Sequence, residues 1–247
     1  MPLCFRRATI VPAGFSRHLP GVALFLVLAW LFLAASTGAA AQTVSDGWTQ
    51  PTMVVESYGT IAGSGMALTG DNYGNLHLFY PNVAEEGLVP SIDYTIWNGS
   101  EWSQPNDIIV GTMVAFPMVA LDAAGLAHLI WLDGGARLQY SSAPIAEARS
   151  AQAWKQPKTF GYAMGAAGIA INEEGEIYVA YADFETQRAI LLTKSADGGT
   201  NWSDPILIAE VSRANVAPNG VQIAIDGSGR LHVVWTEWIL PSGAKSV

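Results

Sequence analysis

The chain has 247 residues, of which 50% are hydrophobic and only 13% are charged, and it contains nine Trp and 25 Gly. This composition excludes an intrinsically disordered protein and is typical of a packed domain that is rich in turns. Asp and Glu outnumber Lys and Arg by 21 to 12. An acidic surface repels nucleic acid and anionic lipid, so we expect neither as a partner.

The N-terminal segment has the pattern of a secretory signal peptide. Three arginines precede the apolar run 21–35, and the small residues that follow end in Ala39-Ala40-Ala41, which is typical of a cleavage site. We therefore expect residues 1–41 to be removed on export to the periplasm, the cell surface or the medium, with no other membrane association. An uncleaved membrane anchor is the alternative, because the apolar run approaches spanning length.

Removal of this segment changes the charge and the thiol content of the protein. Residues 1–41 hold three of the twelve Lys and Arg and none of the 21 Asp and Glu, so the remaining chain carries a formal charge of −12. The single Cys, Cys4, also lies there. We therefore expect an exported protein without disulfides or thiol chemistry, stabilised by its hydrophobic core.

Two landmarks recur along residues 42–247 with a common spacing of 48 to 54 residues. The first is a Trp followed two residues later by Gln or Asp and then Pro, and it begins at Trp48, Trp102, Trp154 and Trp202. The second is an Asp/Asn-x-x-Gly-x-x-His/Tyr pattern, which begins at Asp71, Asp122, Asn172 and Asp226. Two independent landmarks with one period indicate an internal repeat. The expected repeats are 57–110, 111–161, 162–210 and an incomplete 211–247.

Each repeat has the pattern of four short strands. In the second repeat we expect strands at 116–121, 126–132 and 137–142, and a fourth from Trp154 onward. The Asp122-x-x-Gly125 sequence predicts a turn, because Asp accepts hydrogen bonds from backbone amides just after it and Gly adopts the positive φ that closes the turn. Four-stranded units of this length predict an all-β fold, a β-propeller.

Residues 195–202, SADGGTNW, lie between the expected third and fourth strands of the third repeat. They match the pattern S-x-D-x-G-x-x-W at Ser195, Asp197, Gly199 and Trp202, which resembles the Asp box, or BNR repeat, of the sialidase-like propellers. In that family, the resemblance implies, Ser and Asp hydrogen bond within the turn and Trp packs into the blade. We therefore expect the box to be a structural turn and not a ligand site.

The resemblance also bears on the number of blades. Sialidase-like propellers usually have six blades, so the four repeats predict an incomplete six-bladed propeller. The alternative is a closed four-bladed ring, in which residues 48–56 supply the outer strand of the last blade.

Candidate ligand-binding residues follow the second strand of each repeat. Four of them stand five residues after the repeated His or Tyr, namely Asn82, Asp133, Asp183 and Glu237. We expect them on the face opposite the Asp-x-x-Gly turns, with Arg188 and Arg213 nearby. Carboxylates around a pocket bind sugar hydroxyls or a cation, or act as acid and base. The alternative for each is a solvated loop residue. Four aromatic residues are candidates either for stacking on sugars or for the blade core: Tyr162, Tyr181, Trp235 and Trp238.

The repeated histidines are His77, His128 and His232, and the third repeat has Tyr178 in their place. Equivalent histidines on neighbouring blades can converge on a metal, but Tyr178 would break such a ring. We expect hydrogen-bonded strand residues and no metal site.

The sequence argues against a complete sialidase. In those enzymes, the resemblance implies, three arginines bind the substrate carboxylate, the first in an Arg-Ile-Pro-type motif, and a Tyr–Glu pair and an Asp carry out the chemistry. This chain has no Lys or Arg between Arg17 and Arg137, and no later Arg is followed by x-Pro. It also lacks a nucleophile elbow, a phosphate-binding Gly loop and a zinc motif. We expect a monomeric propeller without a cofactor that binds a glycan or a protein. The alternative is a sialidase-type glycoside hydrolase whose site is only partly present.

Overall fold

Nearly all regular structure in the described residues is β-strand. The computed structural model describes residues 52–55, 65–82, 89–213 and 215–239, and from Met53 onward they belong to one unit. The expected signal peptide and most of the expected strand at 48–56 lie outside these residues. Within the described part of the chain, no helix has the length and apolar character needed to cross a bilayer.

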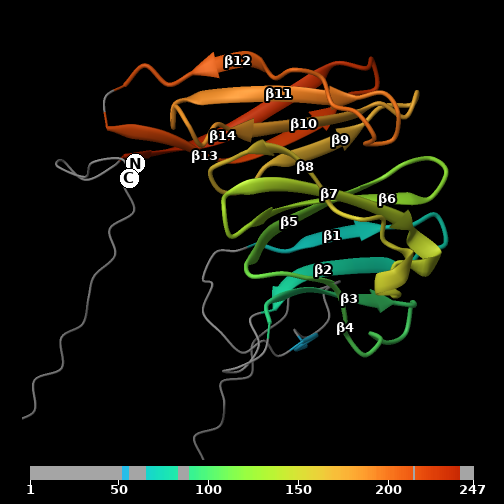
Figure 1. Ribbon diagram of the computed structural model, residues 1–247. Coiled ribbons are helices and arrows are strands. Elements are labelled where there is room, and N and C mark those ends of the chain that lie inside the picture. Colours follow the sequence, from blue (N-terminus) through green and yellow to red (C-terminus); the bar gives the residue numbers. More distant parts are fainter. Residues whose placement is uncertain (1–51, 56–64, 83–88, 214, 240–247) are drawn as a thin grey trace, which may run out of the picture. The chain divides into compact units, whose positions relative to one another are not determined.

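The strands form four antiparallel sheets that follow one another along the chain (Figure 1). The first sheet has the order β1 (Ala67–Gly70), β2 (Leu76–Asn82), β3 (Ser91–Trp97), β4 (Asn106–Val110). The second has the order β5 (Val114–Leu121), β6 (Leu126–Asp133), β7 (Arg137–Pro144), β8 (Lys158–Tyr162), with the short 3-10 helices η1 (Ile145–Glu147) and η2 (Ala151–Ala153) before β8.

The third sheet consists of β9 (Gly168–Ile171), β10 (Ile177–Ala182), β11 (Ala189–Ser195) and β12 (Ile206–Glu210), and the fourth of β13 (Val216–Ile225) and β14 (Leu231–Ile239). The all-β prediction and the prediction of blade-like four-stranded units are confirmed. The four strands expected in the second repeat correspond to β5–β8, and β8 begins at Lys158, after η2, because the connection from β7 is longer here.

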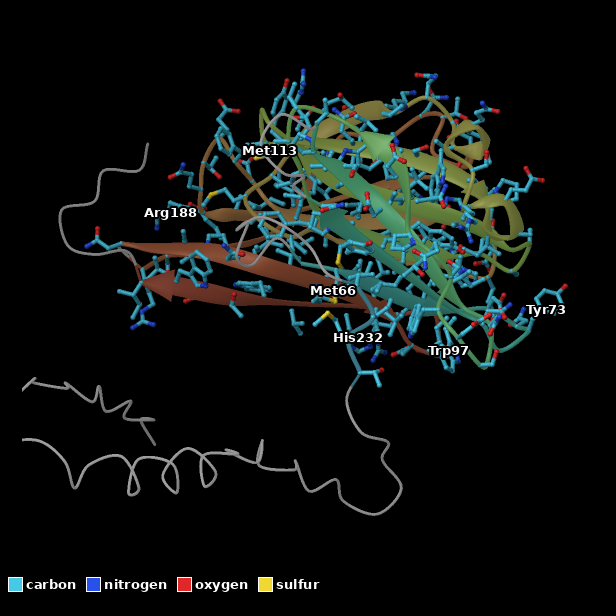
Figure 2. The ribbon with its side chains drawn as sticks, turned by 90° about the horizontal axis from the view of Figure 1, so that it is seen from below. Met66, Tyr73, Trp97, Met113, Arg188 and His232 are labelled. Carbon is cyan, nitrogen blue, oxygen red and sulfur yellow. The ribbon has the colours of Figure 1, made fainter. Side chains whose placement is uncertain are left out.

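The Asp-x-x-Gly turns join the first two strands of a sheet by the expected mechanism. One carboxylate oxygen of Asp71, Asp122 and Asp226 accepts backbone N–H groups two and four residues later, at 2.8–3.1 Å. Gly125 closes its turn at φ +79°, which costs a glycine little. These turns lie at one end of the sheets, and the loops after β6 and β10 lie at the other. Figure 2 shows Tyr73 of the first turn at one end and Arg188 toward the other.

The core is divided among the interfaces between neighbouring sheets. In β6, Leu129 and Trp131 are buried against the first sheet, whereas Ile130 and Leu132 are buried against the third. A third cluster, around Ala180, Ile190 and Val221, joins the third sheet to β13. The continuous apolar run of β6 is therefore explained by a strand that is buried on both faces.

Candidate functional site

A hollow of about 790 Å³ opens between the second and third sheets, at the end that carries the loops after β6 and β10. One wall comes from β8 and its neighbourhood, with Phe160, Gly161 and Tyr162, and the other comes from β10–β12. The volume lies within the range of small-molecule sites in proteins. We call this hollow the inter-sheet pocket.

Aromatic and aliphatic side chains form the walls of the inter-sheet pocket. Tyr181 lies at its base and is 2% exposed, while Tyr162 and Phe184 are 54% and 43% exposed. Leu207, on the outermost strand β12, is also exposed and lines the pocket. Large apolar rings that remain in solvent beside a cavity are typical of a binding surface, because folding alone would favour their burial.

Three carboxylates line the same pocket: Asp183, Glu185 and Glu210. Asp183 Oδ2 accepts the backbone N–H of Thr186 at 2.8 Å, which orders the loop after β10. Glu210 forms a long ion pair with Arg188, with Nε 3.9 Å from Oε1. No Lys, Arg or His is among the described residues that line the pocket.

A comparison of the three sheets explains why Asp183 faces the pocket. In the first sheet, Asn82 on β2 donates to Asp93 on β3 at 2.7 Å. In the second sheet, the amide and the carboxylate have changed strands, and Gln139 on β7 donates to Asp133 on β6 at 2.8 Å. In the third sheet, the strand register places Leu191 of β11 opposite Tyr181 of β10. Leu191 therefore occupies the position that Gln139, opposite Trp131, has in the second sheet. A leucine offers no polar atom, so this bridge across the hairpin is not possible for Asp183.

Asp133 is held within its own sheet. Arg137 donates to it from Nε and Nη2 at 2.7 Å, and the Gly135 N–H donates at 3.0 Å. Burial alone would raise the pKa of Asp133, but the hydrogen bonds from Gly135, Gln139 and Arg137 together hold this pKa below its usual value. Asp133 does not line the inter-sheet pocket, although Gly135 does.

The other predicted charged residues, Arg188, Arg213 and Glu237, also lie outside the pocket. Arg188 donates to the carbonyl of Val211 from Nε and Nη2 at 3.0 and 2.6 Å, which directs its guanidinium to the chain after β12. Arg213 is exposed in the connection to β13, and Glu237 is exposed on β14 opposite Pro218. Of the predicted polar and charged candidates, only Asp183 lines the pocket, and two of the predicted aromatic candidates, Tyr162 and Tyr181, line it as well.

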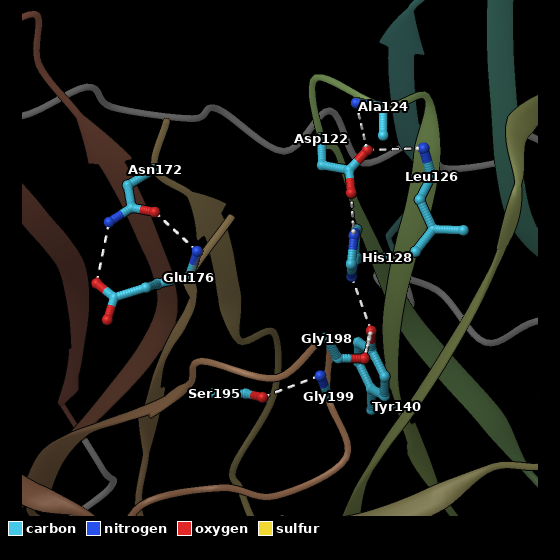
Figure 3. Close-up of polar contacts among 10 residues, drawn as sticks. All are labelled: Asp122, Ala124, Leu126, His128, Tyr140, Asn172, Glu176, Ser195, Gly198 and Gly199. Carbon is cyan, nitrogen blue, oxygen red and sulfur yellow. Dashed lines mark hydrogen bonds and ion pairs between the residues drawn. The ribbon is translucent and has the colours of Figure 1, made fainter. Parts of the chain in front are cut away.

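The repeated histidines make hydrogen bonds within their own sheets, as expected. His128 lies with Nε2 3.3 Å from Asp122 and Nδ1 2.7 Å from the Tyr140 hydroxyl (Figure 3). His77 makes the same two contacts, with Asp71 and Tyr94. Burial lowers the pKa of both histidines, and the facing aspartates oppose this shift only in part. In the described part of the chain, no three His, Cys, Asp or Glu side chains form a group that could hold a metal ion.

The Asp box joins the third sheet to the second. Ser195 Oγ donates to Asp197 at 2.9 Å and accepts the Gly199 N–H at 2.9 Å. Tyr140 of β7 donates to the Gly198 carbonyl at 3.0 Å, so the network of Asp122, His128 and Tyr140 ends on the box (Figure 3). Trp202 stacks on Phe160 of β8, with centroids 4.3 Å apart. All of these contacts are internal to the protein.

Sequence reasoning missed much of the aromatic and acidic lining of the pocket. Phe184 and Glu185 directly follow the predicted Asp183, so attention to the whole loop would have found them. Phe160 and Glu210 lie on the outermost strands β8 and β12. Their approach depends on how two sheets pack, which the repeat pattern does not specify.

No protein-family model matches the chain, and no curated protein matches its sequence. Solved structures share its fold. A Dyadobacter fermentans protein of unknown function aligns with a TM-score of 0.53 and 15% identity over 70% of this chain and 61% of its own. The Penicillium chrysogenum alpha-L-arabinanase complexed with arabinobiose aligns with a TM-score of 0.52 and 10% identity, over 70% and 56%.

The exo-beta-1,3-galactanase of Phanerochaete chrysosporium, solved with beta-1,3-galactotriose, aligns with a TM-score of 0.52 and 12% identity over 75% of this chain and 45% of its own. This chain therefore spans 61% or less of the length of these three proteins. The similarity shows the class of fold alone, a β-propeller. The more specific sialidase-like assignment rests on the Asp box alone.

Proposed function

We propose that the protein is a secreted, sialidase-like β-propeller that binds carbohydrate in the inter-sheet pocket and does not hydrolyse sialosides. The observation that carries this proposal is the pairing of exposed rings, Tyr162 and Phe184, with carboxylates in one pocket. The C–H faces of a sugar pack on aromatic rings, while its hydroxyls donate to carboxylates. Similar folds that were solved with arabinobiose and galactotriose support a carbohydrate as the class of ligand.

The charge of the pocket supports binding without sialidase activity. A sialoside carries a carboxylate, which in this pocket would meet Asp183, Glu185 and Glu210, with no arginine among the described lining residues to bind it. Like charges at short range oppose such binding. The sequence also lacks the first arginine motif that a sialidase requires. A protein ligand is the competing occupant of the same surface.

The proposal is tested with the exported protein on a glycan array and by titration with the glycans that bind. Tyr162→Ala and Phe184→Ala are each expected to weaken binding about two- to twelvefold, because one lost stacking contact costs about 0.5–1.5 kcal/mol. Tyr73→Ala is the matched control, since Tyr73 is 89% exposed at the other end of the sheets. Absence of any glycan ligand, or binding that both pocket variants retain, would contradict the proposal.

The remaining expectations have their own measurements. We expect no release of a fluorogenic aglycone from a sialoside above a buffer blank, and turnover would overturn the non-enzymatic reading. Secretion predicts that the exported protein begins at Gln42, after the small residues. N-terminal sequencing of protein from the medium or periplasm tests this, and retention of residues 1–41 would favour an anchor. Sedimentation tests the monomer expected from the sequence.

A further inference from the structure

We infer that the inter-sheet pocket selects sugars that carry a free ammonium group, that is amino sugars, over neutral sugars of the same shape. This inference deepens the proposed function and rests on it. It begins from the distribution of charge: three carboxylates line the pocket, and no basic side chain among the described residues does. A neutral sugar gains hydrogen bonds from these carboxylates, whereas an ammonium group gains charge-assisted ones.

The two arginines near the pocket make contacts within the protein, and one of them, Arg188, pairs with a lining carboxylate. Arg137, next to the lining residue Gly135, makes two 2.7 Å contacts with Asp133. Arg188 donates to the Val211 carbonyl at 2.6 and 3.0 Å, and its Nε is 3.9 Å from Glu210. Neither guanidinium lines the pocket. Arg188 offsets part of the charge of Glu210, so the charges of Asp183 and Glu185 are the ones left largely for a ligand to neutralise.

The aromatic lining favours the same ligand. Tyr162 and Phe184 keep about half of their surface in solvent beside the carboxylates. The face of an aromatic ring attracts a cation electrostatically, in addition to packing against the C–H groups of the sugar. Rings and carboxylates together can thus surround an ammonium group that projects from a sugar ring. An N-acetyl group at the same position keeps the shape but loses the charge.

The expected preference is moderate, because Glu185 and Glu210 are exposed and solvent screens their charges. We expect an affinity for the amino sugar about five- to tenfold above that for its neutral counterpart at low salt. We also expect this ratio to fall as salt is added, since the Debye length shortens to about 3 Å at 1 M. Stacking does not depend on salt in this way, so binding of neutral sugars is expected to change little.

The test compares three β-1,4-linked tetrasaccharides that differ at carbon 2: cellotetraose, the tetramer of N-acetylglucosamine and the tetramer of glucosamine. Calorimetric titration of the exported protein at about pH 6 keeps the sugar amines protonated. The glucosamine tetramer is expected to bind most tightly. In the variant with Asp183→Asn and Glu185→Gln, its advantage is expected to disappear while cellotetraose still binds. The matched control changes two exposed carboxylates of the first sheet, Glu101→Gln and Asp107→Asn, and is expected to keep the preference.

The outcomes separate this inference from the proposed function. Equal affinity for the three tetrasaccharides, or a preference that the pocket variant retains, overturns the inference but leaves carbohydrate binding in place. If none of the three tetrasaccharides binds and the glycan array shows no ligand either, the proposed function itself is overturned. Equal loss of preference in the pocket variant and in the matched control would assign the effect to net charge and would also overturn the inference.

Discussion

Trp202 is predicted to stabilise the contact between the second and third sheets. Its indole stacks on Phe160 at an interplanar angle of 14° and meets the Tyr140 ring edge-on, with centroids 5.4 Å apart. Both partners belong to the second sheet, while Trp202 ends the Asp box of the third. Trp202→Ala therefore removes a contact between sheets and leaves the strands of each sheet paired.

The magnitude follows from the burial of the indole. Truncation of a fully buried Trp to Ala costs about 3–5 kcal/mol. Trp202 is only partly buried, so we expect a loss of about 2–3 kcal/mol, of which the ring pairs supply roughly 0.5–1.5 kcal/mol each. For a unit of this size, such a loss lowers the melting temperature by about 4–12 °C.

Urea unfolding followed by tryptophan fluorescence and by circular dichroism measures this change in the free energy of unfolding. A double-mutant cycle with Phe160→Ala is expected to show a coupling of about 0.5–1.5 kcal/mol. Asp197→Ala is the comparison within the box, and a smaller loss is expected because Asp197 is exposed. Unchanged stability of Trp202→Ala, or loss of glycan binding in Asp197→Ala at an unchanged melting temperature, would refute the structural role of the box.

Two further predictions concern the same sheets. Gly199 has φ +84°, and an added Cβ would overlap the Tyr140 ring, so Gly199→Ala is expected to destabilise the protein by at least about 2 kcal/mol, measured by urea unfolding. The second is a pH dependence. Burial lowers the pKa of His77 and His128 in the folded state, so below about pH 6.5 the unfolded chain binds protons that the folded protein does not. Stability should therefore fall as pH drops from 6.5 toward the lowered pKa. His128→Gln is expected to flatten this slope, and an unchanged slope would contradict the prediction.

The sequence determined the type and order of the strands, because these follow from local chemistry. In Asp122-x-x-Gly125 the carboxylate and the glycine close the turn between neighbouring strands, and the apolar run of β6 requires burial on both faces. The end of the sheets that carries Asp183 also follows from the repeat, since strands alternate in direction. These features depend on residues that are close in sequence or repeat with a fixed period.

Only the tertiary structure decided which of the symmetric candidates faces a pocket. Asn82, Asp133 and Asp183 have equivalent places in the repeat, yet two of them bridge their own hairpins because Asp93 and Gln139 stand diagonally across on the next strand. Leu191 makes that bridge impossible in the third sheet, and the approach of β8 brings Tyr162 beside Asp183. This selection depends on pairs of side chains from different strands and sheets, whose meeting is set by register and packing and not by any one stretch of sequence.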